Sequence, residues 1–508
     1  MGLYNFALPV GGPLAARAIP DTVRRILVVV VALTGLRFVL AATLPLSFDE
    51  SYFWLWSRHL ALSYYDHPPM IAIAIRLGTL LFGDTEFGVR FVPMLASVAT
   101  ILAVWRAATI LLRDEYAAAI ACCLLSVTLM FTAESMAATP DSLVLAASAV
   151  LLWTFAKLED TRDGRWWLAA GLAVGIALFS KYTAFFLVAS VALWLVATPR
   201  GRAWLGTPWP YAGGLIALAF LIPNLVWNAA HSWISFKFQF GRVVAGRPTA
   251  RYAIEFVASQ LALASPFALV LGAAGLARET QISRTARPLS FAAAMVWPAV
   301  AYFAIHCLHD RVQGNWPSFV YPAFVLLATS AFVSPSSGRR TEGLLRYCRV
   351  LVFPVAAFIL LVGYTQAFTG SLLPAESDPI ARMTATGIGP VARQISNIAH
   401  RENAAAIATT KYTMTGWLSF YLRPHIPIVQ LSQDYRWLSA PRAGDDLLRK
   451  PLLYVTQHPE REMPLVATRF SNVRFLAALH RERGDTTIDT MFVYALSGFD
   501  GHDIGRVP

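Results

Sequence analysis

The chain has 508 residues, of which 56% are hydrophobic and 14% are charged, and its mean hydropathy is +0.52. A soluble domain carries about 25% charged residues, so this composition excludes an ordinary soluble protein. The formal charge of +12 does not indicate a nucleic-acid-binding protein, because the Lys and Arg residues lie in short loops between apolar runs, where they orient a membrane protein.

Apolar runs recur along the first two thirds of the chain, each close to the roughly 20 residues that a helix needs to cross a bilayer. They predict a polytopic α-helical membrane protein with about 11 transmembrane helices. The predicted spans are Ile26–Leu44, Phe91–Leu112, Tyr116–Ala133, Ser142–Ala156, Trp167–Phe179, Tyr182–Ala197, Tyr211–Trp227, Tyr252–Ala277, Phe291–His306, Trp316–Val333 and Val350–Phe368.

The segment Met70–Phe82 is apolar but short and contains Arg76. We expect a helix that lies along the outer surface, because a full span here would turn the later Arg-rich loops outward. With this assignment the loops that hold Arg24, Arg113, Arg165, Arg200, Arg284 and Arg349 all face the cytoplasm. The other face, outside the bacterial cytoplasmic (inner) membrane, then holds the unusual acidic motifs.

The composition changes after Gly370. We expect residues 1–370 to form the transmembrane domain and residues 371–508 to form a soluble periplasmic α/β domain. Short strands are predicted at Ala404–Thr409, Ile426–Leu431, Leu452–Val455 and Thr490–Leu496.

Two polar stretches follow the first predicted span: Ser47–Phe53, which contains Asp49 and Glu50, and Tyr64–Pro69, which contains Asp66 and His67. Acidic groups at a membrane surface are costly unless they face water, a partner or a substrate, so this region is a candidate site. The alternative is a polar loop with aromatic anchors and no chemistry.

Other outer loops add carboxylates and cations. Carboxylates can act as a general base or hold a cation, and Lys or Arg can neutralise a phosphate, so the set suits a lipid-phosphate substrate at a membrane surface. The set comprises Asp49, Glu50, Asp66, His67, Glu134, Asp141, Lys181, Lys237, Arg242, Arg247, Arg251, His309, Asp310, Arg311 and Asn315.

Five motifs occur in order on this face: Phe48-Asp49-Glu50, Tyr65-Asp66-His67-Pro68-Pro69, Thr139-Pro140-Asp141, Ser180-Lys181-Tyr182 and Asn315-Trp316-Pro317. Together they resemble the bacterial family-39-like branch of the GT-C glycosyltransferases, which includes relatives of protein O-mannosyltransferases and lipid A aminoarabinose transferases. The tail segment Tyr412–Leu438 is similar to the outer domain of the same branch. The resemblance implies a GT-C-like fold. It also implies inverting transfer of a sugar from a polyprenyl-phosphate donor to lipid A or lipopolysaccharide, another glycan or a protein hydroxyl.

By position, the resemblance implies that Asp49 is the catalytic base and that Asp141 orients the acceptor or assists the base. It also implies that Lys181 lies near the donor phosphate, with Arg247 adding to it. Glu50 either contacts substrate or fixes the loop by hydrogen bonding. Substrate contacts are further expected from Tyr65, Asp66, His67 and Asn315.

Asp66 and His67 match a position where some relatives place a cation-binding or phosphate-binding pair. Two adjacent ligands do not make a metal site without a third from elsewhere. We therefore favour a structural or phosphate contact over a divalent metal and expect no required cofactor.

Two rival functions fit the composition. A lipid-linked sugar transporter or flippase explains many helices, but transporters place ionisable groups near the midplane and often show inverted repeats. A non-catalytic envelope assembly protein explains the soluble tail but not the ordered motifs.

Overall fold

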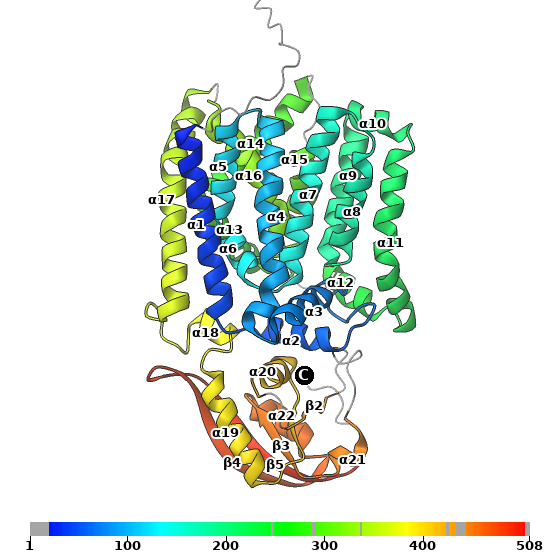
Figure 1. Cartoon of the computed structure of the whole chain (residues 1–508), viewed down its shortest axis with the longest axis vertical. Helices are drawn as coiled ribbons and strands as arrows, with labels where there is room; N and C mark the ends of the chain where they lie inside the picture. The colour runs from blue at the N-terminus through cyan, green and yellow to red at the C-terminus, as the bar shows by residue number, and fades with distance from the viewer. Residues whose placement is uncertain are drawn as a thin grey trace, which may run out of the picture.

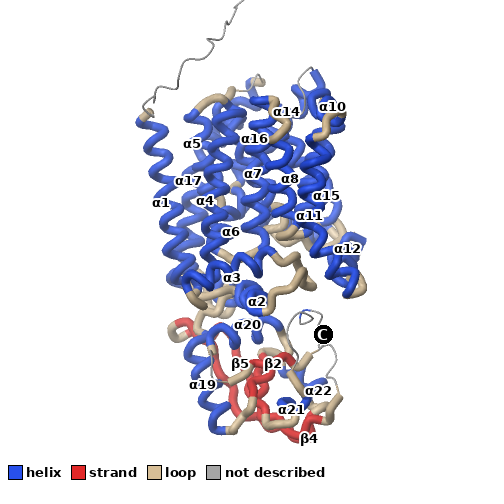
Figure 2. The backbone as a smooth tube through the Cα atoms, turned by 45° about the vertical axis from the view of Figure 1, so that its right-hand side comes forward, coloured by secondary structure: helices blue, strands red, loops and turns tan. Residues whose placement is uncertain are grey.

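The computed structural model describes residues 20–244, 248–285, 291–335, 338–422, 426–432, 436 and 443–502. The molecule has two parts, a bundle of roughly parallel helices and a smaller α/β part at one end of the bundle (Figure 1). Figure 2 shows that the strands gather at that same end.

Helices long and apolar enough to cross a membrane dominate the bundle. Five pass that test alone in the described chain: α1 (Asp21–Thr43), α4 (Glu86–Leu112), α7 (Pro140–Thr161), α11 (Trp209–Ala230) and α17 (Arg339–Thr369). Three bent pairs pass it together: α5 (Glu115–Ser126) with α6 (Leu129–Met136), α9 (Phe185–Ala197, after the 3-10 turn Tyr182–Ala184) with α10 (Pro199–Leu205), and α13 (Ala250–Ala264) with α14 (Pro266–Thr285). Besides Met70–Phe82, the shorter apolar helices of the described chain are α8 (Trp166–Leu178), α15 (Phe291–His306) and α16 (Tyr321–Val333, after the 3-10 turn Ser318–Val320). The chain is therefore a multi-pass membrane protein, while the total of eleven crossings stays a prediction.

Two of the predicted spans, Tyr116–Ala133 and Tyr252–Ala277, are each interrupted by a sharp bend between two helices. The chain bends by 68° between α5 and α6 and by 98° between α13 and α14. The second bend follows from Pro266, which disfavours a helical conformation at the preceding Ser265; the φ of Ser265 is 77°. At the first bend, Thr128 caps α6 by accepting a hydrogen bond from the N–H of Phe131 at 3.2 Å.

Helices at the end of the bundle nearest the α/β part are short. They are α2 (Phe48–Arg58), α3 (Met70–Phe82) and α12 (Ile234–Val244). The prediction of a helix over Met70–Phe82 is confirmed, and Figure 1 shows α2 and α3 lying across the bundle end. In α3, Ile71 and Ile75 are buried whereas Leu80 is exposed, so the helix packs on protein with one face and leaves the other for lipid.

Two glycines allow a close contact between α8 and α11 in the bundle. A Cβ atom on Gly171 of α8 would lie 2.2 Å from the backbone oxygen of Gly213 in α11, and one on Gly213 would lie 2.4 Å from the oxygen of Trp167. Small residues let membrane helices approach until backbone meets backbone. The α8–α11 pair therefore depends on both glycines.

The α/β part follows α17. Its elements are α18 (Pro379–Met383), α19 (Ile388–Arg401), β1 (Ala406–Thr409), α20 (Tyr412–Tyr421), β2 (Ile428–Gln430), α21 (Asp445–Leu448), β3 (Leu452–Thr456), α22 (Pro459–Val466), β4 (Phe470–Arg483) and β5 (Thr486–Phe499). The strand order is β2-β1-β3-β5-β4, with β1 parallel to β2 and β3, and β5 antiparallel to β3 and β4. In the parallel half, Ala408 pairs with both Val429 and Tyr454.

All four predicted strands are confirmed, with shifted ends. The strand β4 was missed, because its charged and half-exposed sequence lacks a buried apolar run. Its register comes from pairing along nearly its whole length with β5.

Candidate active site

The acidic stretch after α1 is held by a capping box at the start of α2. The Ser47 side chain accepts a hydrogen bond from the N–H of Glu50, and the Glu50 carboxylate accepts one from the N–H of Ser47 at 2.8 Å. This reciprocal arrangement satisfies two donors that a helix start leaves open. It fixes the start of α2 and with it the position of Asp49 in the first turn.

Glu50 is 1% exposed and its carboxylate is fully engaged. Arg90 of α4 donates to both carboxylate oxygens at 2.6 and 2.8 Å, and the N–H of Ala138 donates at 2.9 Å. Burial by itself raises the pKa of Glu50, but the Arg90 guanidinium and the two backbone donors outweigh it and lower the pKa below its ordinary value. Of the two roles expected for Glu50, these contacts support fixing the loop rather than binding substrate.

Asp49 has a very different environment. It is half-buried, and among the described residues its carboxylate accepts one hydrogen bond, from the Tyr412 hydroxyl at 3.4 Å. Burial, followed by the nearby charge of Asp66, raises the pKa of Asp49 to about 6. A carboxylate with a raised pKa and few hydrogen bonds is well suited to accept a proton near neutral pH.

Asp66 faces Asp49 from the next loop. Its carboxylate accepts hydrogen bonds from the Tyr52 hydroxyl at 3.0 Å and from Arg436 at 3.2 Å. His67 packs its ring against Phe53, with the ring centres 6.0 Å apart. Among the described residues no group of three or more His, Cys, Asp or Glu side chains could hold a metal ion. Two donors to the Asp66 carboxylate are thus a tyrosine hydroxyl and an arginine guanidinium.

A second cluster is built on Asp141 at the start of α7. Lys181 Nζ lies 2.6 Å from Asp141 Oδ2, and both side chains are buried. Asn315 donates to the same oxygen at 3.1 Å, and the Ser318 hydroxyl donates to Oδ1 at 3.2 Å. Three of the predicted site residues thus meet in one network, although the sequence assigned Asp141 to the acceptor and Lys181 to the donor phosphate.

Hydrogen bonds join the loops that carry these clusters. The N–H of Ala138, three residues before Asp141, reaches Glu50, and the N–H of Met70 donates to the carbonyl of Phe179 at 3.0 Å, two residues before Lys181. Both clusters therefore lie in one layer at the end of the bundle that carries α2 and α3, as Figure 1 shows for those helices.

Of the remaining predicted residues, Tyr65 contacts α12. Tyr65 stacks at a tilt against Phe238 of α12, with ring centres 4.7 Å apart, and Gln239 of α12 donates to the carbonyl of Asp66 at 2.8 Å. Helix α12 therefore covers the acidic loop. Arg247 lies outside the described residues.

Sequence reasoning missed four residues of the site, one of which is Tyr412, the donor to Asp49. Arg90 and Ser318 gave no signal, because an arginine inside an apolar helix and a serine after a proline are recognised only by what they touch. Arg436 lies in the tail segment already noted for its resemblance, but its reach to Asp66 is set by how the α/β part docks.

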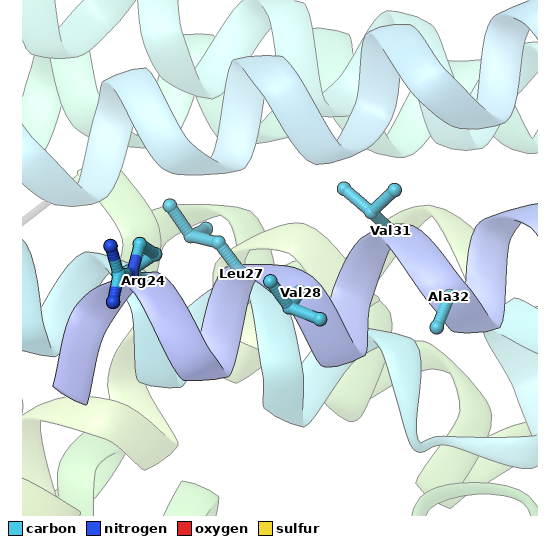
Figure 3. Close-up of a pocket in the computed structure, with 5 residues that line it drawn as sticks. All are labelled: Arg24, Leu27, Val28, Val31 and Ala32. Carbon is cyan, nitrogen blue, oxygen red and sulfur yellow. The ribbon is translucent and has the colours of Figure 1, made fainter. Parts of the chain in front are cut away.

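An apolar groove at the other end of the molecule is unrelated to these clusters. It is lined by Arg24, Leu27, Val28, Val31 and Ala32, all from the first turns of α1 (Figure 3). These side chains belong to one membrane-spanning helix and point outward. We assign the groove to the bilayer-facing surface.

Comparison with known proteins finds glycosyltransferases. A family model described as dolichyl-phosphate-mannose-protein mannosyltransferase matches residues 66–227. The chain is 25% identical over 388 residues to lipid A galacturonosyltransferase RgtD of Rhizobium johnstonii, covering 74% of this chain and 77% of that protein. It is 31% identical over 185 residues to undecaprenyl phosphate-alpha-4-amino-4-deoxy-L-arabinose arabinosyl transferase of Pseudomonas aeruginosa, covering 35% of this chain and 32% of that protein.

Solved structures share the fold over nearly the whole chain. ArnT from Cupriavidus metallidurans in the apo state matches with a TM-score of 0.60 at 15% identity, covering 94% of this chain and 98% of that one. The Archaeoglobus fulgidus oligosaccharyltransferase in complex with Zn and sulfate matches with a TM-score of 0.51 at 12% identity, covering 93% and 73%. The chain therefore shares the fold of these structures, and its sequence is similar to glycosyltransferases.

Proposed function

We propose that the chain transfers a sugar from a polyprenyl-phosphate-linked donor to a hydroxyl group of lipid A, with inversion, at the periplasmic face of the bacterial inner membrane. The observation that carries this proposal is the state of Asp49. It is a half-buried carboxylate with a raised pKa, in the same loop layer as the buried Lys181–Asp141 pair.

The chemistry needs one base. Asp49 takes the proton of the acceptor hydroxyl while the hydroxyl oxygen forms a bond to the anomeric carbon of the sugar. The bond from that carbon to the phosphate oxygen breaks, and its electron pair leaves with the polyprenyl phosphate. The leaving group is stable as an anion, so no general acid is required.

The Lys181–Asp141 pair gives this layer a buried cation beside the membrane. A phosphate that approaches Lys181 competes with Asp141 for the ammonium group, while Asn315 and Ser318 still hold Asp141 in place. We infer that Asp141 positions Lys181 toward the donor phosphate rather than acting as a second base.

The orientation and the soluble domain belong to the same proposal. The basic loops flank the opposite end of the bundle from α2, which supports a periplasmic site by the positive-inside rule. Residues 371–508 then form the periplasmic domain over that site.

The names of the relatives support the class of substrates. RgtD is a lipid A galacturonosyltransferase, and the Pseudomonas relative is named for undecaprenyl phosphate-linked 4-amino-4-deoxy-L-arabinose. Each name contains a sugar with an ionisable group, galacturonic acid or aminoarabinose. Donors that carry each of these two sugars are therefore the first to test.

The test uses the full chain in lipid nanodiscs with lipid A and with undecaprenyl-phosphate-linked galacturonic acid or aminoarabinose. Mass spectrometry of lipid A reports the transfer. We expect product with one donor, and a loss of about 10²–10⁴-fold in kcat for Asp49→Asn, the range for a general base. Asp163→Asn, at the opposite end of the bundle, is the matched control. Full activity of Asp49→Asn, or no product with either donor, would contradict the proposal.

A further inference from the structure

Two residues of the α/β part, Tyr412 and Arg436, reach the acidic layer of the bundle. Tyr412 begins α20, which follows β1, and Arg436 follows β2. Both residues come after parallel strands in the sequence, and the carboxyl ends of such strands commonly carry binding residues. Figure 1 shows α20 at the face of the α/β part that meets α2.

The docking of α20 on α2 is close. A Cβ atom on Gly416 would lie 3.0 Å from both the Ser51 hydroxyl oxygen and the Tyr52 nitrogen. Trp54 and Phe420 pack edge to face, with ring centres 5.2 Å apart. The α/β part is therefore seated against the helix that carries Asp49.

Arg436 lies within a cage of aromatic and acidic groups. Its guanidinium donates to Asp66 at 3.2 Å and lies 4.8 Å from the ring centre of Tyr412 and 5.6 Å from that of Tyr65. Tyr412 stacks at a tilt on Tyr52 with ring centres 4.7 Å apart and donates to Asp49. A cation over two tyrosine faces is attracted by their ring quadrupoles, so the two rings help to hold the guanidinium beside Asp66.

We propose that the α/β part completes the catalytic site, with Arg436 balancing the charge of the neighbouring carboxylates Asp49 and Asp66 and with Tyr412 orienting Asp49. Both are positioning residues, since each acts on the reaction through Asp49. This inference rests on the proposed function, because it takes Asp49 as the base.

Electrostatics explains why a positioning cation is needed. The charged and titratable groups that act on Asp49 are Asp66 from the facing loop, Tyr412 from α20, Arg436 from the loop after β2 and Glu50 from its own helix. Arg90 already neutralises Glu50. Asp66 raises the pKa of Asp49 whereas Arg436 lowers it. Without Arg436, two half-buried carboxylates would repel each other and Asp49 would stay protonated to a higher pH.

The experiment measures the pH dependence of kcat/KM for the full chain in nanodiscs, with whichever of the two donors named above the wild-type chain uses. Arg436→Gln should move the acid limb upward by about 1 pH unit, the lower end of the effect of a close opposite charge. Arg436→Lys should return the acid limb most of the way to its wild-type pH, because lysine keeps the positive charge. Tyr421→Phe is the control. The Tyr421 hydroxyl accepts a hydrogen bond from the N–H of Leu46 and donates one to the Glu86 carboxylate, across the same interface and without a hydrogen bond to Asp49.

An unchanged limb in Arg436→Gln, or an equal shift in Tyr421→Phe, would overturn the inference. Hydrogen–deuterium exchange separates its failure from that of the proposed function. If the wild-type chain transfers neither sugar, the proposed function fails. Faster exchange at residues 64–68 in Arg436→Gln than in Tyr421→Phe would then still support the docking role of Arg436, and equal exchange would overturn it.

Discussion

Asp49 and Asp141 lie in the same layer of the molecule, yet their surroundings are opposite. Asp141 is 3% exposed, and three side chains of the bundle donate to it: Lys181, Asn315 and Ser318. Asp49 is half-buried and accepts one hydrogen bond among the described residues, from Tyr412 of the α/β part. A carboxylate with every oxygen occupied holds other groups in place, whereas one with open oxygens can take a proton.

The comparison also separates the two parts of the molecule. The Asp141 network is built entirely within the helical bundle, so it forms whenever the bundle folds. The surroundings of Asp49 depend on the docking of α20 and of the loop after β2. Four predictions test this difference, from the largest expected effect to the smallest.

The first prediction concerns the buried pair. Removing one partner leaves a buried charge without compensation, so Lys181→Met or Asp141→Asn alone should lower the free energy of unfolding by about 3–5 kcal/mol. The double variant should regain most of that stability and still lack transfer activity. Thermal denaturation in detergent and the transfer assay give the two readouts. If the single and double variants were equally stable, the pair would not be coupled and the comparison would fail.

The second prediction concerns pH. The pKa of Asp49 is raised to about 6, and a base works only when it is ionised. The kcat/KM should therefore be constant well above pH 6 and fall about tenfold per pH unit below it, because one proton inactivates the base. The pH profile of the wild-type chain measures this. A profile that is flat from pH 5 to pH 8 would remove Asp49 as the base.

The third prediction concerns the docking of α20. Gly416→Val adds side-chain atoms where the backbone of Tyr52 leaves no room, and overpacking of this kind costs about 1–3 kcal/mol. Transfer should fall while the bundle stays folded. Gly343→Val is the matched control, since nothing lies within 4 Å of a Cβ at Gly343. Equal losses of transfer in both variants would mean that docking of the α/β part does not matter for catalysis.

The fourth prediction concerns the single hydrogen bond to Asp49. Removing a hydrogen bond of ordinary strength, about 1 kcal/mol, changes an equilibrium or a rate about fivefold. Tyr412→Phe should lower kcat/KM near pH 6 by about that factor. It should also move the acid limb slightly upward, because the Tyr412 hydrogen bond lowers the pKa of Asp49 in the wild-type chain. The pH profile of this variant should be compared with that of Tyr421→Phe, which we expect to match the wild type.

Much of this architecture could be predicted from local patterns. The length of the apolar runs predicted a multi-pass membrane protein, and the short run Met70–Phe82 was confirmed as a helix with those bounds. Alternation and apolar clusters located four of the five described strands. The bend at Ser265 was not predicted, because the hydropathy of the segment is continuous. Pro266 is the local signal that could have indicated it.

The candidate site was predictable in its members but not in its pairings. Asp141, Lys181 and Asn315 were expected in substrate binding or catalysis, and the structure joins them in one network. The partner of Glu50 is Arg90, forty residues away, and the partner of Asp49 is Tyr412, more than three hundred residues away. No local pattern in the sequence relates such positions.

The sequence by itself determined that this chain lies in a membrane and that its acidic motifs gather on one face, because hydropathy and loop charge act over a few neighbouring residues. The tertiary structure decided which carboxylate is held and which is open to a proton. That choice follows from contacts between segments that meet only after the bundle packs and the α/β part docks on it.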